Sequence, residues 1–272
     1  MSFLPKQVSH LFKRPAISLL IKIALAITVT VWLYSNLRGV SLTDGWMFHE
    51  AKRGPVIGDL GGVPVSIPEP YAHFVEYNGD PQFMEPRNGP IPERTYQSKL
   101  RSFGFEIRFP DMAPLTPQTE ADKRAHSIFN TTWIRVRVGS GEHGAKAGYL
   151  ERYLATIKAP DTYRPPYIDV PEKIYGLTSL TPKLANTSGG QNDMPDELYE
   201  DVFYHLNKDG QIDTFIKCSN VRHAAAPCTQ TFSLEPYMHE ATVNVSYRRG
   251  LLNEWMLIQS SVTNVISQFS IN

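Results

Sequence analysis

The run from Ala16 to Tyr34 constrains this chain of 272 residues more than any other feature, because it is apolar apart from Lys22 and a few small hydroxyl residues. A helix rises about 1.5 Å per residue, so a run of this length just crosses a hydrocarbon core of roughly 30 Å. Trp32 and Tyr34 lie at its far end, where interfacial aromatic residues are common. We therefore expect residues 16–34 to form a transmembrane anchor.

The charges before this run predict its orientation. Three basic residues and no acidic residue precede it: Lys6, Lys13 and Arg14. Residues 1–15 should therefore stay in the cytoplasm, and the rest should be exported behind a juxtamembrane linker over 35–53. The alternative is a removed signal peptide with Ile23–Leu33 as its apolar core, although the following YSNLRG is a poor cleavage site. In both cases the remaining chain faces an oxidising compartment.

The two cysteines, Cys218 and Cys228, bracket the short segment SNVRHAAAP between two alternating segments. In an exported domain such a pair usually forms a disulfide, here across neighbouring strands. A metal site with His223 is the alternative, but two cysteines and one histidine do not make a recognised zinc spacing. We expect the disulfide and no metal.

The zero net charge of the whole chain hides an asymmetry. Five of the 27 basic residues and none of the 27 acidic residues lie in the first forty positions, so the remainder carries 22 basic and 27 acidic residues, a net charge of −5. This balance argues against a nucleic-acid surface, which should be basic. It permits a basic protein partner.

Alternation of apolar and polar residues dominates the exported part. It is clear in GGVPVSIPEPY, SFGFEIRFPDM, WIRVRVG, TQTFSLEPYM and ATVNVSYRRG, and it predicts half-buried strands. VFYHLNKDGQIDTFIKC predicts a hairpin that turns at Lys208–Gly210. Apolar residues at helical spacing predict two helices, Tyr149–Lys158 and Leu251–Phe269. The expected fold class is α+β, a mainly antiparallel sheet with two packing helices.

Two arrangements fit these elements. A strand–strand–helix unit could be used twice, once in a first β-rich half over 54–160 and once in a second over 161–272. Alternatively, one continuous sheet could carry both helices on one face.

Long loops rich in Pro, Gly and Asn are the candidate partner interface, because loops of this length are often functional. The first loop, YNGDPQFMEPRNGPIPER, places apolar residues among charges, although these could instead fold back on the core. A second loop is PDMAPLTPQTEADKR, and the third, TPKLANTSGGQNDMPDE, leads into an acidic cluster of Asp193, Asp196, Glu197, Glu200 and Asp201 that lacks the ligand spacing of a calcium loop. The interface candidates are Asp80, Phe83, Met84, Glu85, Arg87, Asp193, Met194, Asp196 and Glu197.

Gly139, Gly141 and Gly144 spell G-x-G-x-x-G after a predicted strand. A dinucleotide site needs a buried parallel strand and a helix that starts at the phosphate. Here the strand carries Arg135 and Arg137 on one face, and the helical pattern begins only at Tyr149. We interpret the glycines as a strand-to-helix corner. With no G-x-S-x-G or H-E-x-x-H motif in the sequence either, we expect a binding protein without cofactor, not an enzyme.

Two stretches carry a resemblance: GPVIGDLGGVPVSIPEPYAHFVEYNGDPQF (Gly54–Phe83) and ERTYQSKLRSFGFEIRFPDM (Glu93–Met112). They resemble membrane-anchored bacterial periplasmic proteins that are found with type VI secretion phospholipase effectors and are regarded as immunity proteins. The resemblance implies a single-pass inner-membrane protein whose periplasmic domain binds a cognate lipase effector and inhibits it by occluding its active site. The alternative is a bitopic scaffold component of an envelope or secretion complex.

Overall fold

The chain divides into two units, Met1–Arg53 and Gly54–Asn272. The structure, a computed structural model, describes residues 54–271 except 82–84, 87–88, 142–143, 145, 161–164, 184–198 and 222. The predicted anchor over 16–34 lies outside the described residues and stays a prediction. Within the described part of the chain, no helix has both the length and the apolar character needed to cross a membrane.

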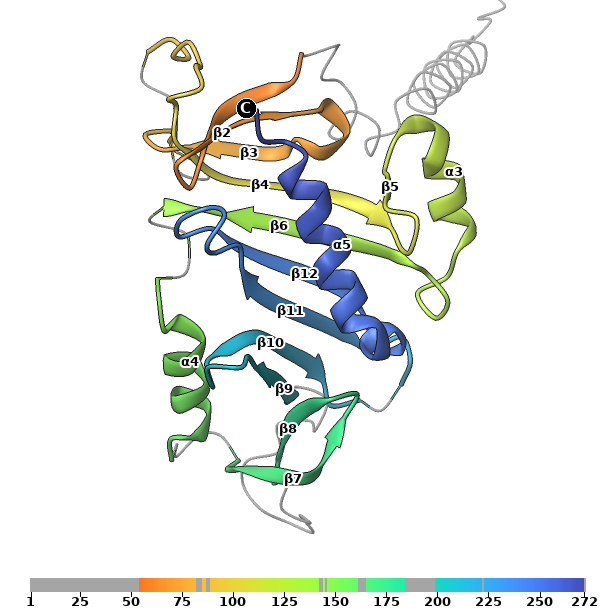
Figure 1. Cartoon of the computed structure of the whole chain (residues 1–272). Coiled ribbons are helices and arrows are strands. Elements are labelled where there is room, and N and C mark those ends of the chain that lie inside the picture. The colour runs from red at the N-terminus through yellow and green to blue at the C-terminus, as the bar shows by residue number, and fades with distance from the viewer. Residues whose placement is uncertain are drawn as a thin grey trace, which may run out of the picture. The chain divides into compact units, whose positions relative to one another are not determined.

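The described unit is built on a sheet of ten strands, all paired antiparallel, in the order β3-β4-β6-β12-β11-β10-β9-β8-β7 with β5 beside β4 (Figure 1). The strands of this sheet are β3 His73–Tyr77, β4 Leu100–Arg108, β5 Ala113–Pro114, β6 Trp133–Gly139, β7 Tyr167–Ile174, β8 Leu177–Pro182, β9 Glu200–Leu206, β10 Ile212–Ser219, β11 Pro227–Ser233 and β12 Thr242–Arg248. The predicted α+β class with a mainly antiparallel sheet is confirmed. Every predicted alternating segment contributes a strand.

Smaller elements complete the unit. They are the hairpin β1 Val56–Leu60 and β2 Val63–Ile67, the helices α3 Pro117–Ala125, α4 Tyr149–Lys158 and α5 Trp255–Ser267, and the 3₁₀ turns η1 Glu69–Tyr71 and η4 Arg249–Glu254. The hairpin is tied to the residues that follow α5, because the Ser66 amide donates to the Phe269 carbonyl at 2.8 Å. The α-helical part of the predicted segment Leu251–Phe269 begins only at Trp255, since η4 precedes it.

Helix α3 was not predicted, because PDMAPLTPQTEADKR has the composition of a proline-rich loop; the structure corrects this expectation. Thr116 is its N-cap: the Thr116 hydroxyl accepts from the Thr119 amide, and the Thr119 hydroxyl accepts from the Thr116 amide. Pro117 occupies the first helical position, where its missing N–H has no consequence. The cap thus supplies helix stability in a segment that has few apolar residues to pack against the core.

The helices α4 and α5 lie on opposite faces of the sheet. In β10, Phe215 packs with Leu150 and Ile157 of α4, whereas the next residue, Ile216, belongs to the core under α5. Successive residues of a strand point to opposite faces, so the expectation of both helices on one face is wrong. Each predicted half does contain a pair of neighbouring strands followed by a helix: β4 and β6 with α4, and β11 and β12 with α5. Helix α3 interrupts the first pair, and the β6–β12 ladder joins both pairs in one continuous sheet.

The face under α5, here called the α5 face, holds the main core. Figure 1 shows α5 crossing in front of the middle strands. The core includes Phe103, Phe105, Val136 and Val245, which are all nearly inaccessible to solvent. The opposite face over β4, β6, β12 and β11, here called the polar face, presents small polar and charged side chains. These belong to Ser102, Glu106, Arg135, Arg137, Asn244, Ser246, Thr229 and Thr231, and Gly104 leaves a position without a side chain among them.

The predicted disulfide is confirmed. Cys218 of β10 and Cys228 of β11 are direct cross-strand partners, and their sulfur atoms are bonded. Both residues are buried in the core of the α5 face, at 0% and 1% exposure. The covalent bond therefore crosses the sheet under η4 and α5, away from solvent.

Candidate functional site

The loop between β3 and β4 carries the first group of predicted interface residues, and its base is closed by an ion pair. The Asp80 carboxylate accepts from the Arg94 guanidinium and, at 2.9 Å, from the Tyr77 amide. Arg94 also stacks on the Tyr77 ring, 4.1 Å from its centroid. Partial burial raises the pKa of the Tyr77 hydroxyl, which donates to the Ile57 carbonyl. Asp80 therefore holds the loop base together, with a side chain only 14% exposed.

Beyond this base the described part of the loop is accessible to solvent. Glu85, Ile91 and Glu93 are exposed, and the Ile91 side chain lacks apolar cover at 73% exposure. Figure 1 shows the loop, coloured orange to yellow, reaching beyond the sheet. The candidates Phe83, Met84 and Arg87 lie outside the described residues. Their place in an interface stays a prediction, as it does for Asp80 and Glu85.

The strand that leads into this loop carries a feature that the sequence analysis missed. Phe74 of β3 is 88% exposed, and its backbone has a φ of 51°, in the left-handed region. It lies at a β-bulge, because His73 pairs with Gly104 and Glu76 pairs with Ser102. Two residues of β3 thus stand opposite Phe103 alone. An exposed phenylalanine in an otherwise ordinary strand pattern gives no signal in the sequence.

The second group of candidates, Asp193, Met194, Asp196 and Glu197, lies outside the described residues, in the segment that connects β8 to β9. Six strands separate β3 from β8 in the sheet. At about 4.8 Å per neighbouring pair the two strands lie roughly 34 Å apart. A standard interface covers about 800 Å² on each partner, and a round patch of that area is about as wide as the separation of these two strands. The structure therefore attaches the two groups to opposite ends of the sheet.

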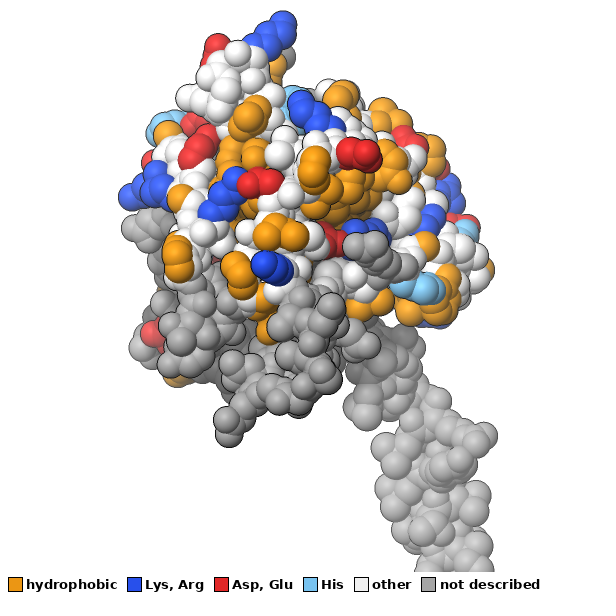
Figure 2. All heavy atoms as spheres, turned by 90° about the horizontal axis from the view of Figure 1, so that it is seen from below, with side chains coloured by type: hydrophobic (Ala, Val, Ile, Leu, Met, Phe, Trp, Pro, Cys, Tyr) orange, Lys and Arg blue, Asp and Glu red, His pale blue; other side chains and the backbone are white. Residues whose placement is uncertain are grey.

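A cavity of about 520 Å³ lies at the β8 end. Its walls come from β7, β8, β9, the loop at His223 and Ala224, and the start of η4. Inside it, Arg249 donates to the Asp201 carboxylate at 2.6 Å and to the Ser219 carbonyl at 2.8 Å. Thr181 donates to the other carboxylate oxygen of Asp201. Seen from this end of the sheet, hydrophobic side chains gather in the middle of the described surface with charged side chains around them (Figure 2).

The two described members of the acidic cluster are neutralised within the chain. Asp201 pairs with Arg249, and Glu200 accepts from Lys217 at 2.7 Å. In the described part of the chain, no group of three or more His, Cys, Asp or Glu side chains is placed to hold a metal ion.

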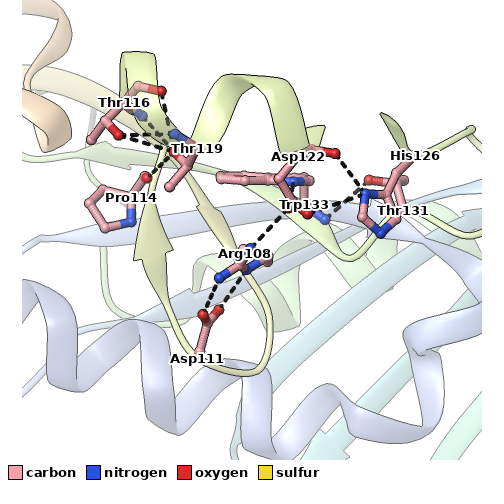
Figure 3. Close-up of polar contacts among 9 residues, drawn as sticks. All are labelled: Arg108, Asp111, Pro114, Thr116, Thr119, Asp122, His126, Thr131 and Trp133. Carbon is pink, nitrogen blue, oxygen red and sulfur yellow. Dashed lines mark hydrogen bonds and ion pairs between the residues drawn. The ribbon is translucent and has the colours of Figure 1, made fainter. Parts of the chain in front are cut away.

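Arg108 organises a polar cluster where α3 meets the polar face (Figure 3). Its guanidinium donates to both carboxylate oxygens of Asp111, at 3.1 and 2.6 Å, and to Asp122 of α3 at 3.0 Å. These hydrogen bonds lower the pKa of both aspartates and raise the pKa of Arg108. Trp133 also donates to Asp122, at 3.3 Å. The acids and the base satisfy one another, so this cluster fixes α3 to the sheet.

The glycine motif forms the predicted strand-to-helix corner. β6 ends at Gly139, and α4 begins at Tyr149. A Cβ atom on Gly144 would lie 1.4 Å from the Glu240 carbonyl oxygen, so this glycine allows close packing against the loop before β12. Gly141 has a φ of 62°, in the left-handed region that favours glycine.

No family model and no curated protein matches the sequence. Among solved structures, the chain is similar to an immunity protein of the Stenotrophomonas maltophilia type IV secretion system, with a TM-score of 0.48 and 18% identity over 80% of this chain and 94% of that one. It is also similar to an iron-regulated outer membrane lipoprotein of Neisseria meningitidis, with a TM-score of 0.43 and 13% identity over 81% and 94%. At these low TM-scores and identities, no residue role is transferred from either protein.

Proposed function

We propose that this protein is an immunity protein, anchored in the bacterial inner membrane by residues 16–34, whose periplasmic domain binds a phospholipase effector of a type VI secretion system and blocks its active site. The observation that carries the proposal is the β3–β4 loop, which is closed at its base by Asp80 and Arg94 and in which residues 85, 86 and 89–93 are exposed. A loop held in this way loses less conformational entropy on binding than an unconstrained one. The two stretches that resemble such immunity proteins, Gly54–Phe83 and Glu93–Met112, flank the exposed part of this loop.

A membrane anchor suits this function. An effector that attacks phospholipids from the periplasm must be stopped next to the membrane, and an anchored inhibitor has a high effective concentration there. Blocking an active-site entrance needs an interface of standard size with a few well-placed anchors. Neither requirement needs a catalytic group in the inhibitor.

The test is survival of cells that express the nearest-encoded phospholipase effector in the periplasm together with this protein. Wild-type protein should protect the cells. A variant in which residues 81–93 are replaced by a short Gly-Ser linker, with Asp80 and Arg94 retained, should melt like the wild type and fail to protect. Arg137→Ala, on the polar face, is the control and should protect fully. Protection by the loop variant, or death of cells with the wild type, would contradict the proposal.

A further inference from the structure

Phe74 is the most exposed large hydrophobic side chain among the described residues, at 88%. It lies on β3, an edge strand of the sheet, four residues before the loop that the proposed function invokes. An isolated exposed apolar residue is common on protein surfaces and needs no explanation. The backbone conformation of Phe74 is what sets it apart.

The left-handed conformation of Phe74 is unfavourable for a bulky residue and is not demanded by a turn. Tyr175 makes the contrast, because it has the same φ of 51°. Tyr175 and Gly176 form the two-residue turn between β7 and β8, where both central residues need positive φ. Phe74 lies inside a strand, so only the bulge imposes its conformation.

Contacts of the two residues that follow Phe74 hold the bulge in place. Val75, the next residue, packs against the core of the α5 face. The Glu76 carboxylate then accepts from the Ser102 hydroxyl at 2.8 Å on the polar side of the sheet. With its neighbours fixed to both faces, the extra residue points away from the sheet. Bulges near functional sites re-aim side chains in this way, and the backbone position of Phe74 is set before any partner arrives.

We infer that Phe74 is an anchor that inserts into the apolar acyl-chain cleft of the phospholipase effector. This inference rests on the proposed function and adds the contact that produces inhibition. An enzyme that hydrolyses phospholipids must offer an apolar cleft to an acyl chain, and a protruding phenyl ring is complementary to such a cleft. Aromatic side chains, phenylalanine among them, are enriched in the buried core of interfaces, and residues that fill a desolvated pocket there contribute most to binding. Binding should therefore compete with long-chain substrate.

The experiment combines thermal unfolding of Phe74→Gly with titration of the purified effector. Glycine tolerates positive φ, so the melting temperature should stay the same or rise by about 1–3 °C. Loss of the ring should weaken the complex by about 30-fold or more. Tyr237→Ala removes another aromatic ring that is 74% exposed, and it should change neither quantity. Tyr175→Gly should match the thermal effect of Phe74→Gly without weakening the complex.

The outcomes separate the two proposals. If the wild-type protein does not bind the effector, the proposed function is wrong and this inference is wrong with it. If the wild type binds and Phe74→Gly binds equally well, only the inference is overturned. A lower melting temperature of Phe74→Gly would show a structural role and would also overturn it. Inhibition that is not competitive with long-chain phospholipid would contradict insertion into the acyl cleft.

Discussion

The two faces of the sheet are stabilised in different ways by adjacent residues of the same strands. Phe105 and Val136 lie opposite one another on the α5 face, while Gly104 and Arg137, the residues next to them, form a pair on the polar face. On the α5 face the side chains are removed from water by α5. On the polar face, Arg135 and Arg137 stay in contact with water. Alternation along a strand thus assigns the core to one face and leaves the other to charge and small polar groups.

Polar groups are satisfied differently on the two faces as well. On the α5 face the Tyr247 hydroxyl donates to the Gln230 side chain at 2.9 Å, and Gln230 donates to Gln259 of α5 at 2.9 Å. Burial raises the pKa of Tyr247, so this hydroxyl stays neutral. On the polar face Arg108 instead lowers the pKa of two aspartates by hydrogen bonding. The first network is neutral and enclosed, and the second is ionic and accessible to water.

The largest expected effect comes from removing a ring from the α5 face. Phe105 is 2% exposed and packs edge-on against Tyr71 and Phe269. Phe105→Ala should lower the free energy of unfolding by about 3–5 kcal/mol, because it leaves a cavity. Arg137→Ala, on the other face, should change it by no more than about 0.5 kcal/mol. Denaturant titration of both variants measures the contrast, and similar losses would show that the faces do not differ as described.

A smaller effect is expected from the disulfide of the α5 face. Replacing Cys218 and Cys228 by alanine removes a bond that closes a separation of 10 residues. For a loop of this length the chain-entropy model gives a loss of about 2–3 kcal/mol. Both cysteines are buried, so reductant should cleave the bond of the wild type only under conditions that unfold the domain. Rapid reduction of the native protein would contradict burial of the bond.

Local patterns predicted most of the strands and the disulfide, because alternation and cysteine spacing are local in sequence. The β6–β12 ladder joins residues about a hundred positions apart, which no local pattern encodes. The placement of α4 and α5 on opposite faces could not be predicted for the same reason. Each helix has one apolar side, but the face of the sheet that it covers depends on contacts between residues far apart in the sequence. Helix α3 was missed because it depends on the Thr116 cap and on ion pairs instead of an apolar stripe.

The candidate site was predictable only in part. Loop length and composition directed attention to the region of Asp80 and Glu85, but they did not show that Asp80 would pair with Arg94. That pair depends on the two ends of the loop meeting. Phe74 could not be found, because the alternation HFVEY conceals the extra residue that the bulge inserts against β4. Register between strands is a tertiary property, and the site depends on it.

The smallest expected effect comes from the ionic cluster of the polar face and depends on pH. The pKa values of Asp111 and Asp122 are lowered in the folded state because Arg108 donates hydrogen bonds to their carboxylates. The stability that these bonds contribute is therefore complete above the ordinary aspartate pKa of about 3.9 and is lost as the pH falls from there through the lower folded values. Arg108→Ala should lower the melting temperature at pH 7 by at most about 3 °C, since water screens exposed pairs.

Acid should then abolish the difference between this variant and the wild type. Below the folded pKa values both aspartates are protonated in the wild type, so its melting curve should converge with that of Arg108→Ala. Arg137→Ala lies on the same face, and none of the ion pairs among the described residues involves Arg137, so its small difference from the wild type should not depend on pH in this range. Thermal melts of the three proteins from pH 7 down to about pH 1, below both folded and unfolded pKa values, provide the measurement. A difference for Arg108→Ala that persists in acid would show that Arg108 stabilises α3 by packing, as residues of the α5 face do, and not through its charge.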